Sequence, residues 1–151
     1  MNTYDELCDL IRSDNHIMCG QGASEAQIRS IEERLDLTLP MSYARFLRDF
    51  GWIHGPFECV HGVGDDVPSN LEVVFVTTSE REIQGLELRP GLVAVCPDGM
   101  GNHYCLDTGK MVDGECPVVF WDHEDPDGGQ QEPEVEAASF AEWLLEEFKS
   151  R

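Results

Sequence analysis

The sequence has few basic residues. Its 151 residues include 10 lysines and arginines against 30 aspartates and glutamates, for a formal net charge of −20. No lysine or arginine occurs between Met111 and Phe148, a segment that contains twelve acidic residues. Such a charge repels the phosphate backbone of nucleic acids and anionic membrane surfaces, and it attracts basic proteins and cations. The composition therefore argues against a nucleic acid or a membrane as direct partner.

The sequence also lacks the features of export. Its first residues carry acids before any apolar run, whereas a secretory signal starts with a basic and then a hydrophobic zone. No run approaches the roughly 20 apolar residues that span a bilayer. We therefore expect a cytoplasmic location and reduced thiols at all six cysteines. These are Cys8, Cys19, Cys59, Cys96, Cys105 and Cys116.

Motifs typical of enzymes are missing as well. The sequence contains no Cys-x-x-Cys pair, no His-Glu-x-x-His, no Gly-x-Ser-x-Gly elbow and no P-loop. The glycine-rich segment 98–102 lacks the third glycine of a dinucleotide fingerprint, and a tight turn explains it better. We accordingly predict no catalytic residues, no cofactor and no bound metal.

Two groups of residues nevertheless contain possible metal ligands. Cys59 with His61, and His103 with Cys105, would each place two zinc ligands on one strand face, but the spacing is not that of a zinc motif. Buried thiols beside a hydrogen-bonded histidine account for them better. Residues 123–134 follow the pattern of a calcium loop, yet the first ligand is a histidine and a strand precedes it. An acidic connecting loop is the favoured interpretation.

The clearest periodic pattern predicts two helices between Ser24 and Phe50. Ser24 and Gln27 have the spacing of a capping box, after which apolar residues recur on one helical face. Pro40 fits the first turn of the second helix, and Gly51 supplies the left-handed conformation that ends it. The inward-facing side chains are expected to be Ile28, Ile31, Leu35, Tyr43, Phe46, Leu47 and Phe50.

Helices are expected at both ends of the chain, with strands between them. Residues 3–13 have one apolar helical face, and so does the helix beginning at Ser139, through Phe140, Trp143, Leu144 and Phe148. Short apolar runs separated by glycine and proline predict strands at 57–63, 71–76, 92–96, 103–106 and 118–121.

Turn signals at 107–110 and 113–114 should keep consecutive strands antiparallel, and 125–136 should be a polar loop. The order of elements predicts one α+β domain over residues 1–151. It would consist of a mainly antiparallel sheet with N-terminal helices and a C-terminal helix packed against it. Ile31, Phe46, Leu47 and Trp143 are expected to make that packing.

Several ordered pieces between Ser24 and Phe148 carry a family resemblance. They are Ile28–Leu35; Leu39-Pro40 with Tyr43, Phe46-Leu47 and Gly51; Cys96-Pro97-Asp98-Gly99 with Gly101, Tyr104 and Leu106-Asp107; Pro117-Val118; Asp122-His123; and Ser139-Phe140 with Trp143-Leu144. In order and spacing they resemble the SUKH superfamily, which includes fungal cell-wall-assembly regulators and bacterial immunity proteins. Asn102 stands where the family often has aspartate. The resemblance implies a family core over 24–148 with an added N-terminal helix over 3–13.

The resemblance also implies a function. The family has no shared catalytic residues, and its bacterial members look like inhibitors that bind toxins directly, frequently toxins acting on nucleic acid. We expect an immunity protein whose partner is a cognate, basic toxin domain. A regulatory scaffold unrelated to toxins is the alternative, followed by a metal-binding enzyme. The acids in the sheet turns and the late loop would bind the toxin: Asp65, Asp66, Asp98, Asp122, Glu124, Asp125 and Asp127.

Overall fold

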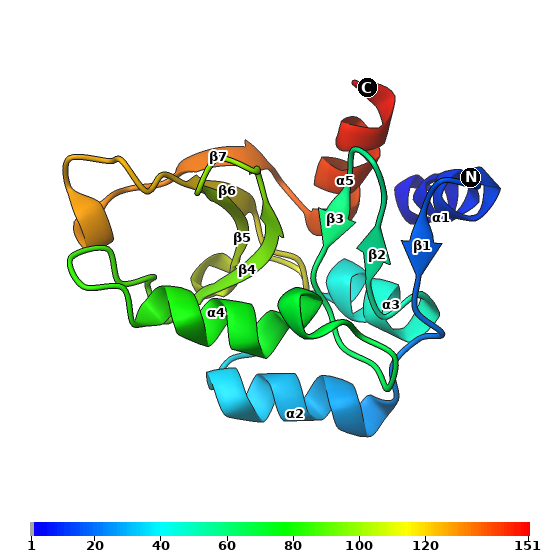
Figure 1. The fold of residues 1–151 in the computed structure, drawn as a ribbon, viewed down its shortest axis with the longest axis horizontal. Coiled ribbons are helices and arrows are strands. Elements are labelled where there is room, and N and C mark those ends of the chain that lie inside the picture. The colour runs from blue at the N-terminus through cyan, green and yellow to red at the C-terminus, as the bar shows by residue number, and fades with distance from the viewer. Residues whose placement is uncertain (1) are drawn as a thin grey trace.

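The computed structural model describes residues 2–151 and has an α+β fold, as predicted (Figure 1). The described helices are α1 (Thr3–Ser13), α2 (Glu25–Leu35), α3 (Met41–Asp49), α4 (Val73–Arg81) and α5 (Phe140–Lys149), with short 3-10 turns η1 (Ser69–Leu71), η2 (Thr108–Lys110) and η3 (Gly128–Gln130). The strands form two antiparallel sheets. The small sheet contains β1 (Met18–Cys19), β2 (Ile53–His54) and β3 (Cys59–Val60), and the large sheet has the order β4 (Leu92–Pro97), β5 (His103–Asp107), β6 (Val118–Trp121), β7 (Glu134–Ala137).

The capping box predicted for α2 is confirmed. The Ser24 hydroxyl accepts the Gln27 backbone N–H at 3.1 Å, and the Gln27 side chain accepts the Ser24 N–H at 2.9 Å. Pro40 lies one position earlier than predicted, as the N-cap of α3. Gly51 has φ of 80° and donates its N–H to the Phe46 carbonyl at 3.3 Å, so it ends α3 as expected.

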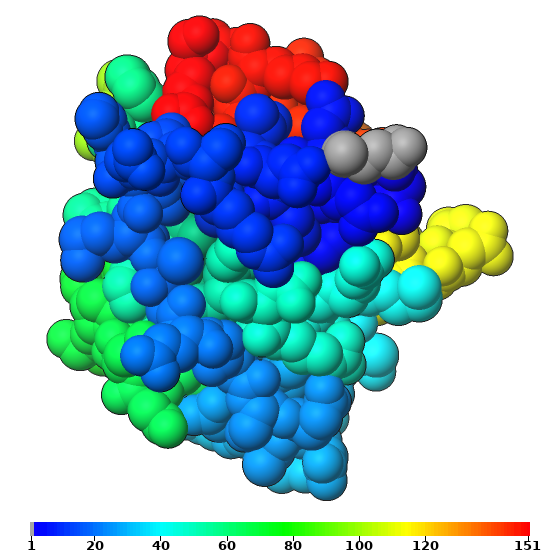
Figure 2. Space-filling view, turned by 90° about the vertical axis from the view of Figure 1, so that its right-hand side faces the viewer, coloured from blue at the N-terminus to red at the C-terminus, as the bar shows by residue number. Residues whose placement is uncertain are grey.

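The two terminal helices, α1 and α5, lie next to each other (Figure 1). The Lys149 ammonium is 3.1 Å from the Glu6 carboxylate, which links them at the surface. Ser139 caps α5 by accepting the Glu142 N–H at 3.2 Å. Figure 2 shows α1 in blue between α5 in red and α3 in cyan, with the yellow segment near residue 110 projecting beside them.

The prediction of a strand at 71–76 is wrong. Leu71 is the last residue of η1, and residues 73–76 begin α4. The Glu72 side chain accepts the N–H groups of Val74 and Phe75 at 3.1 and 2.9 Å and so caps a helix. The helix then buries Val73, Val74 and Thr77. This tertiary packing overrides the strand preference of a valine-rich run.

Other boundaries also differ from the prediction. Strands β4, β5 and β6 match the predicted runs to within one residue, but only Cys59–Val60 of the run 57–63 is a strand. The segment predicted as a loop over 125–136 contains η3 and ends in β7. The strands form two separate sheets rather than one.

Both faces of the large sheet are covered by apolar residues. The main core lies between the sheet, α5 and the N-terminal helices, and it includes the four residues expected to make that packing, Ile31, Phe46, Leu47 and Trp143. A smaller cluster lies on the α4 side and contains Leu88, Leu92, Ala94, Cys105, Val119 and Trp121. There the buried Thr77 hydroxyl accepts the Ala94 N–H at 3.1 Å, which fixes α4 on β4.

His61 connects the two sheets. Its backbone N–H donates to the Val95 carbonyl at 2.8 Å, and its carbonyl accepts the Tyr43 hydroxyl at 2.8 Å. The imidazole is only 3% exposed, and neither ring nitrogen has a hydrogen-bond partner. The expected hydrogen-bonded histidine is therefore not found here. Burial, helped by the nearby His103, lowers the pKa of His61 to about 4.

Replacing Trp143 with Ala tests the main core. The indole is buried and packs against Tyr104, with ring centroids 5.3 Å apart. The substitution should lower the free energy of unfolding by about 3–5 kcal/mol in urea denaturation, because it leaves a cavity. Glu146→Ala, at an exposed position of the same helix, should stay within about 0.5 kcal/mol of the wild type. A loss below about 1 kcal/mol for Trp143→Ala would contradict the packing.

His61 should make folding sensitive to mild acid. The unfolded chain protonates this imidazole near pH 6.5 and the folded chain only near pH 4, so falling pH through this range favours unfolding. The associated loss of stability amounts to about 3 kcal/mol. Urea denaturation between pH 7 and 4.5 should show a shallower pH dependence for His61→Leu. The exposed His54, replaced with Gln, serves as control, and identical slopes for both variants would refute the assignment.

Candidate functional site

The structure does not bring the seven predicted partner-binding acids into one cluster. Asp65 and Asp66 lie in the loop between β3 and η1, beside the start of α2. Asp98 lies in the β4–β5 turn. The other four, Asp122, Glu124, Asp125 and Asp127, lie in the late loop, which is the segment 122–133 between β6 and β7. Figure 1 shows this late loop at the left end of the molecule, whereas the β3–η1 loop lies right of centre, below β2. The predicted site therefore divides into two separate surfaces.

Asp65 and Asp66 hold their own loop in place. The Asp66 carboxylate accepts the Trp52 indole N–H at 3.0 Å and the Gln21 backbone N–H at 3.1 Å. Asp65 accepts the Gln27 side-chain amide at 3.0 Å. These contacts join segments far apart in the sequence. Both carboxylates thus have a structural role that the sequence pattern does not reveal.

Asp98 organises the tight turn that was predicted at 98–102. Its carboxylate accepts the backbone N–H groups of Met100 and Asn102 at 2.8 and 3.0 Å and the Asn102 side-chain amide at 2.8 Å. Burial alone would raise the pKa of Asp98, but the hydrogen bonds from Asn102 and Met100 lower it overall. The Asn102 side chain also accepts the His123 backbone N–H at 2.9 Å. The turn is thereby attached to the late loop.

The late loop is held from inside by Gln131, which the sequence did not single out. The Gln131 side chain is 1% exposed; it accepts the Asp122 N–H at 3.0 Å and donates to the carbonyls of Asp122 and Gly128 at 2.9 and 3.0 Å. Asp122 and Asp125 also accept the N–H groups two residues further on, at 2.9 and 2.8 Å. The loop therefore presents its carboxylates on an ordered backbone.

The four possible zinc ligands do not form a metal site. The His103 ring nitrogen is 3.1 Å from the Glu80 carboxylate on α4, and Cys105 is buried, which raises the pKa of its thiol. Across residues 2–151, no three His, Cys, Asp or Glu side chains are arranged to hold a metal ion. The six cysteines are free thiols. Cys59, His61, His103 and Cys105 thus lack the geometry of a zinc site.

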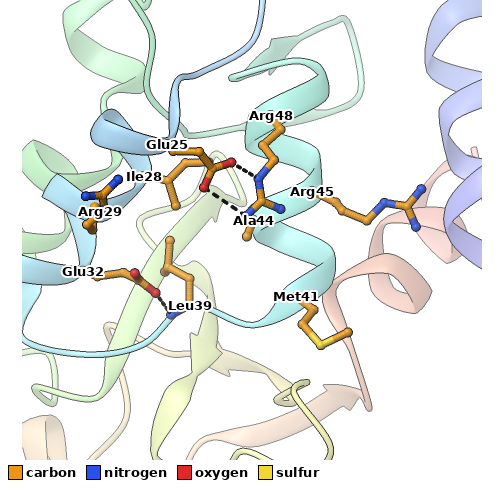
Figure 3. A pocket seen from close by; sticks show the side chains of 9 residues that line it. All are labelled: Glu25, Ile28, Arg29, Glu32, Leu39, Met41, Ala44, Arg45 and Arg48. Atoms are coloured by element: carbon orange, nitrogen blue, oxygen red, sulfur yellow. Dashed lines mark hydrogen bonds and ion pairs between the residues drawn. The ribbon is translucent and has the colours of Figure 1, made fainter.

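A groove of about 430 Å³ lies between α2 and α3 (Figure 3). Arg29, Arg45 and Arg48 line it, over an apolar floor that includes Ile28 and Leu39. Arg48 pairs with the Glu25 carboxylate, and the Arg45 guanidinium lies 4.2 Å from the centre of the Tyr4 ring. Figure 3 shows Arg45 pointing away from the other side chains of the groove. The basic groups of this groove are therefore largely paired within the protein.

A further acidic surface surrounds β7 and was not predicted. Glu134 and Glu136 are exposed on this strand, and Glu147 of α5 is half-buried nearby. Burial, followed by the proximity of Glu136 and Glu146, raises the pKa of Glu147. In the sequence, the alternating Glu-Val-Glu pattern was the signal that could have predicted this surface.

Of the helices that the structure describes, none is both long and apolar enough to cross a membrane.

Comparison with known proteins identifies a similar fold and the family of this chain. A solved structure described as a protein from Pseudomonas syringae pv. tomato superposes with a TM-score of 0.58 and 18% identity, covering 80% of this chain and 81% of that chain. That similarity shows a shared fold. The model of the SUKH_5 family, described as SMI1-KNR4 cell-wall, matches residues 4–149 and so includes α1. Because this match covers nearly the whole chain, the protein belongs to the SMI1-KNR4 (SUKH_5) family of the SUKH superfamily.

Proposed function

We propose that this protein is a non-enzymatic immunity protein that binds and neutralises a cognate, basic toxin domain that acts on nucleic acid. The observation that carries the proposal is the stretch from Met111 to Phe148, which has twelve acids and no lysine or arginine. It folds into consecutive elements, β6, the late loop, β7 and most of α5. Membership of a superfamily that includes bacterial immunity proteins is consistent with this role.

The late loop has the properties of a phosphate mimic. A toxin that cleaves or modifies nucleic acid binds phosphates through basic side chains, and carboxylates on an ordered loop offer the same charge. Opposite charges steer such partners together at rates as high as about 10⁸–10⁹ M⁻¹s⁻¹ at low salt. Because Gln131 and Asn102 already hold the loop backbone, little conformational entropy needs to be lost on binding.

Neutralisation of a toxin encoded by a neighbouring reading frame tests the proposal. The frame of interest encodes a large exported protein with a short, basic C-terminal domain. Co-expression of that domain alone should stop bacterial growth, and co-expression with this protein should restore it. Unchanged toxicity, together with no complex on gel filtration, would reject the immunity proposal and favour a regulatory scaffold of the same fold.

Reversal of two late-loop charges tests the steering role. Asp125→Lys with Asp127→Lys should slow association with that toxin domain about tenfold at low salt and flatten its salt dependence, while dissociation changes by about twofold or less. Surface plasmon resonance at two ionic strengths measures both rates.

The matched control is Asp9→Lys with Glu33→Lys, which makes the same charge change at exposed positions on α1 and α2. It should slow association by about threefold or less. An association rate that changes neither with salt nor with the late-loop reversals would reject phosphate mimicry even if neutralisation were observed.

A further inference from the structure

Strand β7 is an open edge of the large sheet. In the order β4-β5-β6-β7 it has a neighbour on one side only, and Figure 1 shows it along the rim. Glu134, Val135 and Glu136 are all exposed, and Val135 as a whole residue is 57% exposed. The opposite edge differs, because β4 receives the His61 N–H and donates to Thr77. Only the β7 edge is therefore free among the edges of this sheet that the structure describes.

The strand register directs the backbone of Val135 outward. The Asp107 N–H donates to the Pro117 carbonyl at 2.9 Å, which sets the alternation of hydrogen bonds between β5 and β6. The backbone groups of Val119 then face β5, and those of Phe120 face β7. Since Val135 stands opposite Val119, its own N–H and C=O point away from β6. An edge strand with such open groups is a template for another strand.

The charges at this edge decide what kind of strand fits. Glu134 and Glu136 flank Val135, and Glu147 lies close to Glu136. A second copy of the chain would bring the same glutamates against one another, and like charges opposite each other destabilise a strand pair. Lysines or arginines at those positions would instead form favourable cross-strand pairs. Charge complementarity therefore selects a basic segment.

We propose that β7 is the docking edge for an extended, basic segment of the partner protein, which adds to the large sheet as a further strand. Main-chain hydrogen bonds to Val135 hold the segment, and its basic side chains pair with Glu134, Glu136 and Glu147. The late loop, which precedes β7 in the chain, attracts the partner first. The inference deepens the proposed function and rests on it for the identity of the partner.

A synthetic probe tests the edge without the toxin. The probe is a blocked eight-residue peptide of alternating lysine and valine, and its control is the same peptide N-methylated at alternate residues. Binding of the first peptide should slow amide exchange at Val135 by about tenfold or more in NMR, because that N–H becomes hydrogen bonded. The N-methylated peptide, with equal charge but no donor edge, should not bind there.

Two variants locate the interaction. Val135→Pro removes the outward N–H while leaving the β6–β7 ladder, since proline is tolerated at such edge positions, and it should abolish peptide binding. Glu134→Lys with Glu136→Lys should weaken binding about tenfold, and the late-loop reversal by about threefold or less. Should the proline variant fail to fold, the N-methylated peptide still decides the question.

The outcomes separate the two proposals. Equal binding of both peptides, or equal losses from the β7 and late-loop reversals, would show non-specific attraction and overturn the docking edge. Neutralisation of the toxin that is unaffected by both Val135→Pro and the β7 reversal would also overturn it while leaving the immunity proposal intact. Peptide binding at β7 without neutralisation of any toxin would retain the edge and reject immunity.

Discussion

The hydroxyl of Tyr43 makes the hydrogen bond on which the arrangement of the layers depends. It donates at 2.8 Å to the carbonyl of His61, whose N–H donates to Val95, so one side chain of α3 connects both sheets. The Tyr43 ring also packs edge-to-face against Phe140 of α5, with ring centroids 5.1 Å apart. Burial raises the pKa of Tyr43 above its ordinary value, so the hydroxyl stays protonated at neutral pH and can donate this bond.

This interior fixes the acidic surface from behind. Phe140, the first residue of α5, packs on Tyr43. At the other side, the late loop follows directly after β6, a strand inside the large sheet. The residues from 122 to 139, which belong to the segment with no basic residue, are thus attached to the core on both sides. Its acids can face outward without mutual repulsion distorting the fold, because internal groups such as Gln131 hold its backbone. A rigid surface of one charge sign is well suited to a basic partner.

Local sequence signals predicted those elements whose residue pattern is complete within a short stretch of the chain. The Ser24 cap with its Gln27 partner, the apolar faces of α1 and α5, and the short apolar runs of β4 to β6 are readable from neighbouring residues. Two elements depended on more distant information. Residues 73–76 became helical through the Glu72 cap and packing against β4, and β7 has only one apolar side chain between two glutamates. Hydrophobic periodicity alone does not identify such elements.

The candidate site, too, was predicted only where the signal is local in the sequence. The acidic character of 111–148 was evident from composition, whereas the use of Asp65 and Asp66 inside the fold depends on Gln27 and Trp52, which are remote in sequence. The link between Asn102 and His123 likewise joins separate turns. Only the folded chain shows that the acids occupy two surfaces and that one of these borders an open strand.

Hydrogen–deuterium exchange of this protein with and without the toxin domain encoded beside it is the most direct measurement of where the partner binds. If the acidic face forms the interface, peptides covering residues 122–137 will exchange more slowly in the complex, with the strongest effect in β7. Peptides from the α2–α3 groove will then change little. Protection confined to α2 and α3, with residues 122–137 unaffected, would contradict binding through the acidic face.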